Sequence, residues 1–407
     1  MDFGLQLAGI PASDMVALAQ QAETSGFSAI YVPDHWAYEQ RGGGLDDKAL
    51  AWEATTILGA LAGATTRVRI GALVLCNLFR HPGTTAQATT TLDHLSGGRV
   101  LLGLGSGWTR SEFEMMGAPF PDVQPRLRML DESVRIIKAL WTSERVTIDG
   151  EFYHLRDAIS VPKPVQKPHP PVMLGGSGKG LLRIAAREAD IVNVISDSGR
   201  AGTILPSEVA KLTDEGFRRK LDFVRSEARA AGRDPDAITL SSTIFIPMLA
   251  DSAEAASNFA TGLGGLFGLS ETEVRRMPLA LIGTADECVA ELHRRGREWG
   301  VRHYILSGYG GAAPRASRAK FWRGRRRSAL PAPPRSACAN GCVPLRSSCG
   351  AFPAEGAFHA NPDFHPCGHD HSGPGGSGRP GACFRPHRQL DRQVVVQGFR
   401  RYEVHER

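Results

Sequence analysis

Short apolar segments alternate with longer amphipathic segments along residues 1–310. The apolar segments have the length of β-strands, and the amphipathic segments repeat apolar residues at helical spacing. Strands are predicted at 3–8, 29–32, 68–75, 100–104, 172–174, 191–194, 239–245 and 304–306. Helices are predicted at 13–25, 49–63, 84–95, 125–141, 179–188, 208–231, 252–262 and 285–299. Eight strands that alternate with helices are typical of a (β/α)8 TIM barrel in the α/β class, whereas an open doubly wound sheet usually has fewer units.

One segment departs from this alternation between the fourth and fifth predicted strands. Residues 145–155 alternate apolar and polar positions around Asp149-Gly150, a dipeptide that favours a tight turn between two strands. The proline-rich segment VPKPVQKPHPP then leads to the fifth strand. The sequence therefore predicts a hairpin inserted after strand four of the barrel.

The composition changes abruptly near residue 312. Residues 312–407 are rich in Arg, Pro, Gly and Cys and have no hydrophobic period, so we expect a disordered tail after a barrel domain of residues 1–311. An alternative interpretation is that this tail is translated out of frame from a GC-rich gene, because the compositional bias begins directly after the last predicted strand.

Charge and cysteine content restrict the class of protein further. The tail holds 16 Lys and Arg against 6 Asp and Glu, so residues 1–311 carry a net charge of −4 although the whole chain carries +6. An acidic body argues against nucleic-acid binding, which needs clustered cations. The body has two lone cysteines, Cys76 and Cys288, no apolar run long enough to cross a membrane and no recognisable signal peptide. We therefore expect a cytoplasmic protein.

The first candidate for chemistry is Asp34-His35, directly after the second predicted strand. In a barrel, residues at the carboxyl ends of the strands face the active-site mouth. Asp34 would fix the tautomer of the His35 imidazole, and His35 would then transfer protons. The alternative is a loop histidine that only satisfies backbone groups. Arg80 likewise would either contact an anion or pair with an acidic side chain.

Two glycine-rich runs follow predicted strands. The run GLGSG at 103–107 would let a flat ring approach the backbone, although the motif alone is weak. Gly175, Gly176, Ser177 and Gly178 lie between a strand and a helix that begins at Lys179. Free N–H groups and the helix dipole at such a turn favour a phosphate, and the alternative is a plain flexible loop.

Other catalytic classes have little support in the sequence. The body contains no HExxH motif, no Cys/His pairs at ligand spacing and no GxSxG motif, so we expect no metal site and no serine hydrolase. The tail holds His365, Cys367, His369, His371 and Cys383, but they lack the paired spacing of a structural zinc site.

Taken together, these residues resemble the luciferase-like monooxygenase family, and most closely its coenzyme F420-dependent oxidoreductase branch. The matching runs are VPDHW, FRHPGTTAQATTTLDHLSGGRVLLGLGSGW, KPHPPVMLGGSGKGLLRIAAREADIVNV and LIGTADECVAELHRRGREWGVRHYIL, in that order along residues 1–310. The resemblance implies a (β/α)8 barrel with an insertion after strand four. It also implies that F420, or alternatively FMN, binds at the carboxyl-terminal mouth.

The resemblance also implies roles for individual residues. His35 would be the catalytic proton-transfer residue, and Asp34 would lie beside the deazaflavin ring. Leu73 and Val74 would form a non-prolyl cis peptide behind the ring. The remaining implied contacts are Cys76, Ser106 and Gly107 along the ring and Gly175, Gly176, Ser177 and Gly178 at the phosphate.

One position departs from the pattern of the family's sugar-phosphate dehydrogenases. Trp108 occupies the place where those enzymes carry an acid, which argues against sugar-phosphate oxidation. Glu112 lies one turn further on and is a possible replacement, although we expect a charge on the exposed face of a helix.

The resulting hypothesis is an oxidoreductase that moves a hydride between F420 and a small organic substrate, as a possible homodimer. One alternative is a monooxygenase that uses FMNH2 and oxygen. The other is a non-catalytic cofactor carrier, or the inactive product of a disrupted gene. The sequence does not identify the substrate.

Overall fold

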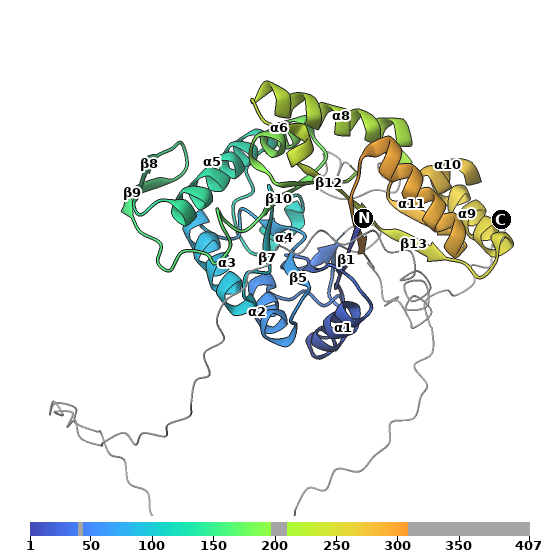
Figure 1. The fold of residues 1–407 in the computed structure, drawn as a ribbon, viewed down its shortest axis with the longest axis horizontal. Coiled ribbons are helices and arrows are strands. Elements are labelled where there is room, and N and C mark those ends of the chain that lie inside the picture. The colour runs from blue at the N-terminus through green and yellow to red at the C-terminus, as the bar shows by residue number, and fades with distance from the viewer. Residues whose placement is uncertain (40–43, 197–209, 308–407) are drawn as a thin grey trace, which may run out of the picture. The chain divides into compact units, whose positions relative to one another are not determined.

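A closed ring of eight parallel strands organises the computed structural model, which describes residues 1–39, 44–196 and 210–307 (Figure 1). Each strand pairs in parallel with the next one in the chain, and the last pairs with the first, so the ring has no open edge. The strands are β1 (Asp2–Gln6), β2 (Ala29–Val32), β5 (Arg69–Ala72), β7 (Val100–Gly105), β10 (Val172–Gly176), β11 (Ile191–Val194), β12 (Thr239–Ile244) and β15 (His303–Ser307).

All eight predicted strands are present, and the predicted (β/α)8 barrel is confirmed. The third predicted strand is the one that differs. Residues 68–75 do not form one continuous strand, because Leu73 and Val74 separate β5 from the short strand β6 (Leu75–Cys76), which pairs with β7. The peptide bond between Leu73 and Val74 is cis, as the resemblance implied.

Amphipathic helices cover the outside of the ring and largely match the predicted ranges (Figure 1). Helices α6 and α11 have the predicted bounds, and the others differ at their ends by a few residues. These barrel helices are α1 (Ala12–Thr24), α2 (Ala54–Ala64), α3 (Pro82–Ser96), α5 (Val123–Thr142), α6 (Lys179–Glu188), α8 (Asp214–Ala230), with a 3-10 turn at Pro235–Ala237, and α11 (Ala285–Trp299).

The strands divide their side chains between two cores because alternate residues point to opposite faces. On β2, Ile30 and Val32 join the large core between strands and helices, whereas Ala29 and Tyr31 belong to a small separate cluster. The other buried members of that cluster come from four more strands of the ring, so it fills the barrel interior: Leu101, Met173, Ile191 and Ile305.

Two excursions extend from the barrel. The predicted hairpin is present as β8 (Val146–Asp149) and β9 (His154–Ala158), and Glu132 on α5 accepts hydrogen bonds from the backbone N–H groups of its turn. The second excursion, between β12 and β15, was predicted only as a helix. It contains a parallel strand pair, two helices and a small apolar core of its own: β13 (Ile246–Leu249), α9 (Ala253–Phe267), α10 (Glu271–Arg276) and β14 (Ala280–Gly283).

Three short elements of the mouth were not predicted. They are β3 (Tyr38–Glu39), which pairs with β4 (Leu45–Asp46), and helix α4 (Arg110–Met115) after β7. The predicted disordered tail, 312–407, lies outside the described residues. Within the described ranges, no helix is both long and apolar enough to cross a membrane.

Candidate active site

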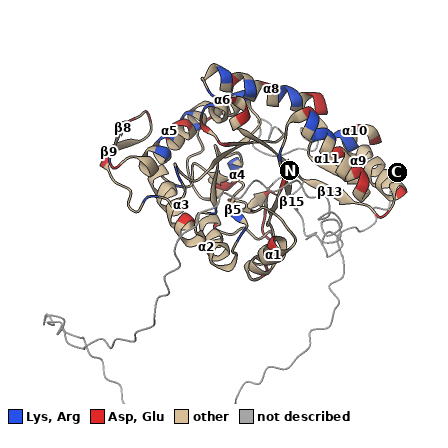
Figure 2. Cartoon of the chain, in the orientation of Figure 1, with Lys and Arg blue, Asp and Glu red and all other residues tan. Residues whose placement is uncertain are grey.

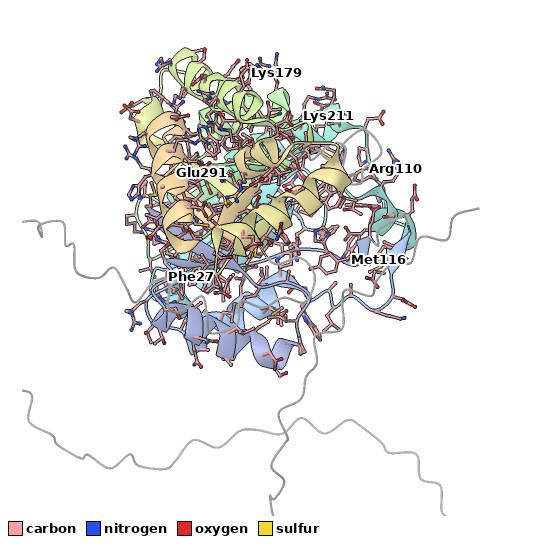
Figure 3. All side chains as sticks on the ribbon, turned by 90° about the vertical axis from the view of Figure 1, so that its right-hand side faces the viewer. Phe27, Arg110, Met116, Lys179, Lys211 and Glu291 are labelled. Carbon is pink, nitrogen blue, oxygen red and sulfur yellow. The ribbon has the colours of Figure 1, made fainter. Side chains whose placement is uncertain are left out.

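The candidate residues meet at one end of the barrel because they all follow the carboxyl ends of parallel strands. Asp34 and His35 follow β2, Leu73, Val74 and Cys76 lie between and in β5 and β6, and Ser106 and Gly107 follow β7. The turn 175–178 joins β10 to α6. In Figure 3, Arg110 and Met116 mark the two ends of the α4 segment and Lys179 marks the first turn of α6.

His35 is held by Glu112 and not, as the sequence suggested, by Asp34. Its Nδ1 lies 2.7 Å from Oε1 of Glu112 on α4. Glu112 is only 2% exposed, so the expectation of a charge on an exposed helix face was wrong. The cause of both errors is that α4 was not predicted. This short helix turns Glu112 inward beside the buried Phe113 and brings it to the loop after β2.

Asp34 instead organises the loop after β6. Its carboxylate accepts hydrogen bonds from the backbone N–H of Cys76 at 2.8 Å and from two nitrogens of Arg80 at 2.7 and 2.9 Å. Arg80 also forms an ion pair with Glu53. Of the two predicted roles, contact with an anion or pairing with an acidic side chain, the structure shows the second. Asp34 is buried, and its ion pair fixes two strand ends relative to each other.

Cys76 is a buried thiol at the mouth. Burial raises its pKa to about 12, and the negative charges of Asp34 and Glu112 act in the same direction. The thiol therefore stays neutral near pH 7 and adds an uncharged, polarisable surface. A Cβ on Gly107 would lie 2.9 Å from its sulfur, and Gly107 has a φ of +77°, so only glycine fits this position.

The glycines of β7 make room for the protein itself. A Cβ on Gly103 would lie 1.9 Å from the carbonyl oxygen of Ala72, and one on Gly105 would lie 2.7 Å from a methyl group of Val74. Gly175 on the neighbouring strand faces the other methyl group of Val74 at 3.1 Å. Gly103 and Gly105 belong to the run that was predicted to admit a flat ring, and at these two positions the space is taken by Ala72 and Val74.

The glycine turn at 175–178, for which the sequence predicted a phosphate, lies directly before a helix N-terminus. Helix α6 begins directly after it, with Gly178 as the N-cap residue, so the first N–H groups of the helix are directed at the turn. A Cβ on Gly178 would meet no atom of the described residues within 4 Å, so none of them closes the turn on that side. The ammonium of Lys220 on α8 donates to the carbonyl oxygen of Ser177 at 2.9 Å and adds positive charge.

Aromatic rings form the wall around His35. The ring of Trp108 meets the imidazole edge-on at a centroid distance of 5.7 Å, and Tyr38 lies at 5.0 Å on a tilted approach. Trp36 stacks on Phe79 at 3.8 Å beside them. Tyr38 was not assigned a place in the site from the sequence. Glu112 was considered there only as a replacement for the acid that Trp108 displaces, and its contact with His35 was not predicted.

No group of three or more His, Cys, Asp or Glu side chains within the described residues has an arrangement that could hold a metal ion. Among the described residues, the site therefore offers the His35–Glu112 pair, the Arg80–Asp34 ion pair, the thiol of Cys76 and the glycine turn at the N-terminus of α6.

Comparison with known proteins places this site in context. A family model described as luciferase-like monooxygenase matches residues 3–303. The chain is 39% identical over 198 residues to an F420-dependent glucose-6-phosphate dehydrogenase of Beutenbergia cavernae, which covers 48% of this chain and 56% of that protein. It is 31% identical over 215 residues to an FMNH2-dependent dimethylsulfone monooxygenase of Pseudomonas putida, which covers 53% of each. The chain thus spans little more than half the length of these relatives.

Solved structures share the fold at lower sequence identity. An F420-dependent secondary alcohol dehydrogenase, in complex with an F420–acetone adduct, superposes with a TM-score of 0.60 at 22% identity, over 75% of this chain and 93% of that one. The coenzyme F420-dependent tetrahydromethanopterin reductase from Methanopyrus kandleri gives a TM-score of 0.61 at 19% identity, over 80% and 97%.

Proposed function

Because the chain belongs to the luciferase-like monooxygenase family, we propose that it is an oxidoreductase that moves a hydride between coenzyme F420 and a small organic substrate. The observation that carries the proposal is the placement of an open glycine turn at a helix N-terminus and a carboxylate-bound histidine at the same mouth. The similarity to F420-dependent dehydrogenases supports F420, and the similarity to an FMNH2-dependent enzyme keeps FMN as the alternative cofactor.

The residues at the mouth fit a ring that carries an anionic tail. Gly175, Gly176, Ser177 and Gly178 would hold the phosphate through N–H groups and the α6 dipole. Leu73 and Val74 would support the ring, with Cys76, Ser106 and Gly107 along its edge. The buried Asp34 would contribute by fixing Cys76 and Arg80 in place.

When bound, the coenzyme would supply the hydride acceptor or donor, and the protein would supply orientation and proton transfer. We assign the proton transfer to His35. Its side chain is 12% exposed, so it reaches the mouth while its inner nitrogen stays on Glu112. The aromatic wall of Trp108 and Tyr38 would exclude water from this part of the site.

We infer that the substrate is not a sugar phosphate, although relatives act on glucose 6-phosphate. The resemblance implies that Trp108 stands where those enzymes carry an acid. Glu112, the possible replacement, is turned toward His35 and the loop after β2. A substrate with an apolar or flat portion fits such an aromatic wall better than a sugar does.

Titration of the full-length protein with F420 and with FMN tests the cofactor assignment. We expect F420 to bind at micromolar concentration or below and FMN to bind at least tenfold more weakly. Tighter binding of FMN, with oxygen consumption in its reduced form, would support the monooxygenase alternative. Binding of neither cofactor by a soluble, cooperatively folding protein would support the inactive product of a disrupted gene.

We also propose that the protein is a cytoplasmic homodimer. Cys76 and Cys288 are both free, which is consistent with a reducing compartment. Helix α2 has no charged residue, and the only acid on its neighbour α3, Asp93, is buried, whereas α8 and α11 carry many charges (Figure 2). Depletion of charge is typical of interface cores. Light scattering should give twice the chain mass, and Ala60→Arg on the exposed face of α2 should give the monomer.

A further inference from the structure

We propose that Glu112 is a positioning residue that fixes His35 in the tautomer with a bare Nε2, so that the nitrogen able to face the substrate is a base. This inference rests on the proposed function, in which His35 transfers the proton. The buried carboxylate of Glu112 lies on helix α4, 77 residues after His35 in the chain.

The hydrogen bonds of Glu112 determine which atom carries the proton. Oε2 accepts from the backbone N–H of Trp36 at 2.6 Å and, at the longer distance of 3.4 Å, from that of Ala37. Oε1 is left for His35, at 2.7 Å from Nδ1. A carboxylate has no hydrogen to donate, so Nδ1 must be the donor. In a neutral imidazole the proton on Nδ1 leaves a lone pair on Nε2.

The walls of the site keep the ring in this orientation. Trp108 meets the imidazole at an interplanar angle of 83° and Tyr38 at 45°, so the ring is confined on two sides. Turning the ring over would exchange Nδ1 for a carbon and leave the buried Oε1 of Glu112 without its donor, which is unfavourable for a buried charged group. The tautomer and the orientation are therefore set by the same contact.

The same contact stabilises the product of proton transfer. In the oxidation of a carbinol, the O–H proton passes to Nε2, the C–H bond gives its electron pair with the hydrogen to the coenzyme as hydride, and the C–O single bond becomes a carbonyl. The imidazolium that results lies beside an anionic carboxylate, which offsets its charge. The neighbouring Asp34 is already paired with Arg80, so its charge is directed elsewhere.

Nitrogen NMR of the neutral histidine side chains tests the proposal without any substrate. The His35 resonance is identified by its loss in His35→Asn. At about pH 8.5, where an ordinary imidazole is neutral, we expect the wild-type signal to show a protonated Nδ1 and a bare Nε2. In Glu112→Gln the amide oxygen would accept from Trp36 and the NH2 group would face Nδ1, so the tautomer should reverse.

Two neighbours on α4 provide matched controls. Ser111→Ala removes the other side-chain link from α4 to the loop after β2, a 2.7 Å bond from Ser111 to Glu39, and leaves His35 untouched. Glu114→Gln removes an exposed charge from the same helix. Neither variant should change the His35 tautomer. An unchanged tautomer in Glu112→Gln, or a wild-type ring with the proton on Nε2, would overturn the proposal. If Glu112→Gln does not fold, the wild-type spectrum alone still decides.

Turnover with oxidised F420 and a panel of small primary and secondary alcohols provides the second measurement. We expect Glu112→Gln to lower kcat by about 10–100-fold, with the F420 dissociation constant within twofold of wild type. In the His35→Ala background the same substitution should have no further effect. Independent, multiplicative losses would contradict action through His35. If His35→Ala itself keeps its turnover, the proposed role of His35 fails, and the tautomer result is unaffected.

Discussion

Charged side chains are used differently at the two ends of the barrel. At the amino-terminal end of the strands they bind backbone groups: Glu23 accepts the N–H groups of residues 66–68, and Arg99 donates to carbonyl oxygens of Ala62, Thr65, Val68 and Ser96. At the carboxyl-terminal end they also bind one another: Glu112 binds His35 as well as backbone N–H groups, and Asp34 binds Arg80 as well as a backbone N–H group.

This difference separates stability from chemistry. A charged side chain that hydrogen-bonds to backbone groups holds a loop in one conformation. If such a side chain changed its protonation state, it would lose those hydrogen bonds and the loop would loosen. Backbone hydrogen bonds lower the pKa of Glu23 to about 2, against the effect of partial burial, so it remains an anion at any ordinary pH. At the mouth, the imidazole of His35 can take up a proton while Glu112 keeps its hydrogen bond to the backbone N–H of Trp36. In TIM barrels generally, the carboxyl-terminal face holds the active site and the amino-terminal face contributes to stability.

The largest effect is expected from His35→Ala at the mouth. Removal of the proton-transfer group should lower kcat by about 10²–10⁴-fold and leave the F420 dissociation constant nearly unchanged. The free energy of unfolding should fall by about 1–3 kcal/mol, because the buried Oε1 of Glu112 loses its donor. Steady-state turnover, a binding titration and urea denaturation measure the three quantities. The exposed His293→Ala on α11 serves as the control, and wild-type turnover in His35→Ala would remove this residue from the mechanism.

Arg99→Met at the other end should have the opposite signature. Loss of the guanidinium leaves the carbonyls of several loop residues without a donor, so we expect the free energy of unfolding to fall by about 4 kcal/mol. F420 affinity should stay within twofold of wild type. Urea denaturation measures the loss, with the exposed Arg67→Met as the matched control. A change in affinity larger than the change in stability would break the proposed separation.

The pH dependence of stability should also come from the amino-terminal end. Burial lowers the pKa of His303, which bonds to Tyr31, from 6.5 to about 4. The unfolded chain therefore takes up a proton before the folded one, and stability falls as the pH drops from 6.5 to 4, by about 2–3 kcal/mol from this group. His303→Gln should flatten the stability profile in that window. An unchanged profile would show that His303 does not contribute.

The smallest effect is expected from Gly178→Ala in the glycine turn. A Cβ there meets no atom of residues 1–39, 44–196 and 210–307 within 4 Å, so stability should change by no more than about 0.5 kcal/mol. If the turn holds the phosphate, the added methyl group should weaken F420 binding by about fivefold. A deazaflavin riboside without the phosphate should bind both forms equally well. Equal loss for both ligands would place the effect on the ring and not on the phosphate.

The barrel and the glycine turn were readable in the sequence because their signals are local. Strand β10, the turn 175–178 and helix α6 are contiguous, so apolar spacing and glycine content suffice to place them. The hairpin β8–β9 was predicted for the same reason. Helix α4 was missed because six residues carry too little helical periodicity to be distinguished from a loop. Strand β13 is as long as β2, which was predicted, but it contains Pro247, and proline argues against a strand, so the β13–β14 pair was missed.

The sequence by itself therefore determined the closed parallel barrel, the strand ends that carry candidate residues and the helix N-terminus suited to an anion. Only the tertiary structure decided that the hydrogen-bond partner of His35 is Glu112 and not Asp34. It likewise decided that Arg80 forms an ion pair with Asp34, and that the absence of a side chain at the glycines of β7 leaves room for Val74. The physical reason is distance along the chain. Hydrogen-bond partners compete within a few ångströms in space, and adjacency in sequence does not determine which of two nearby carboxylates reaches an imidazole.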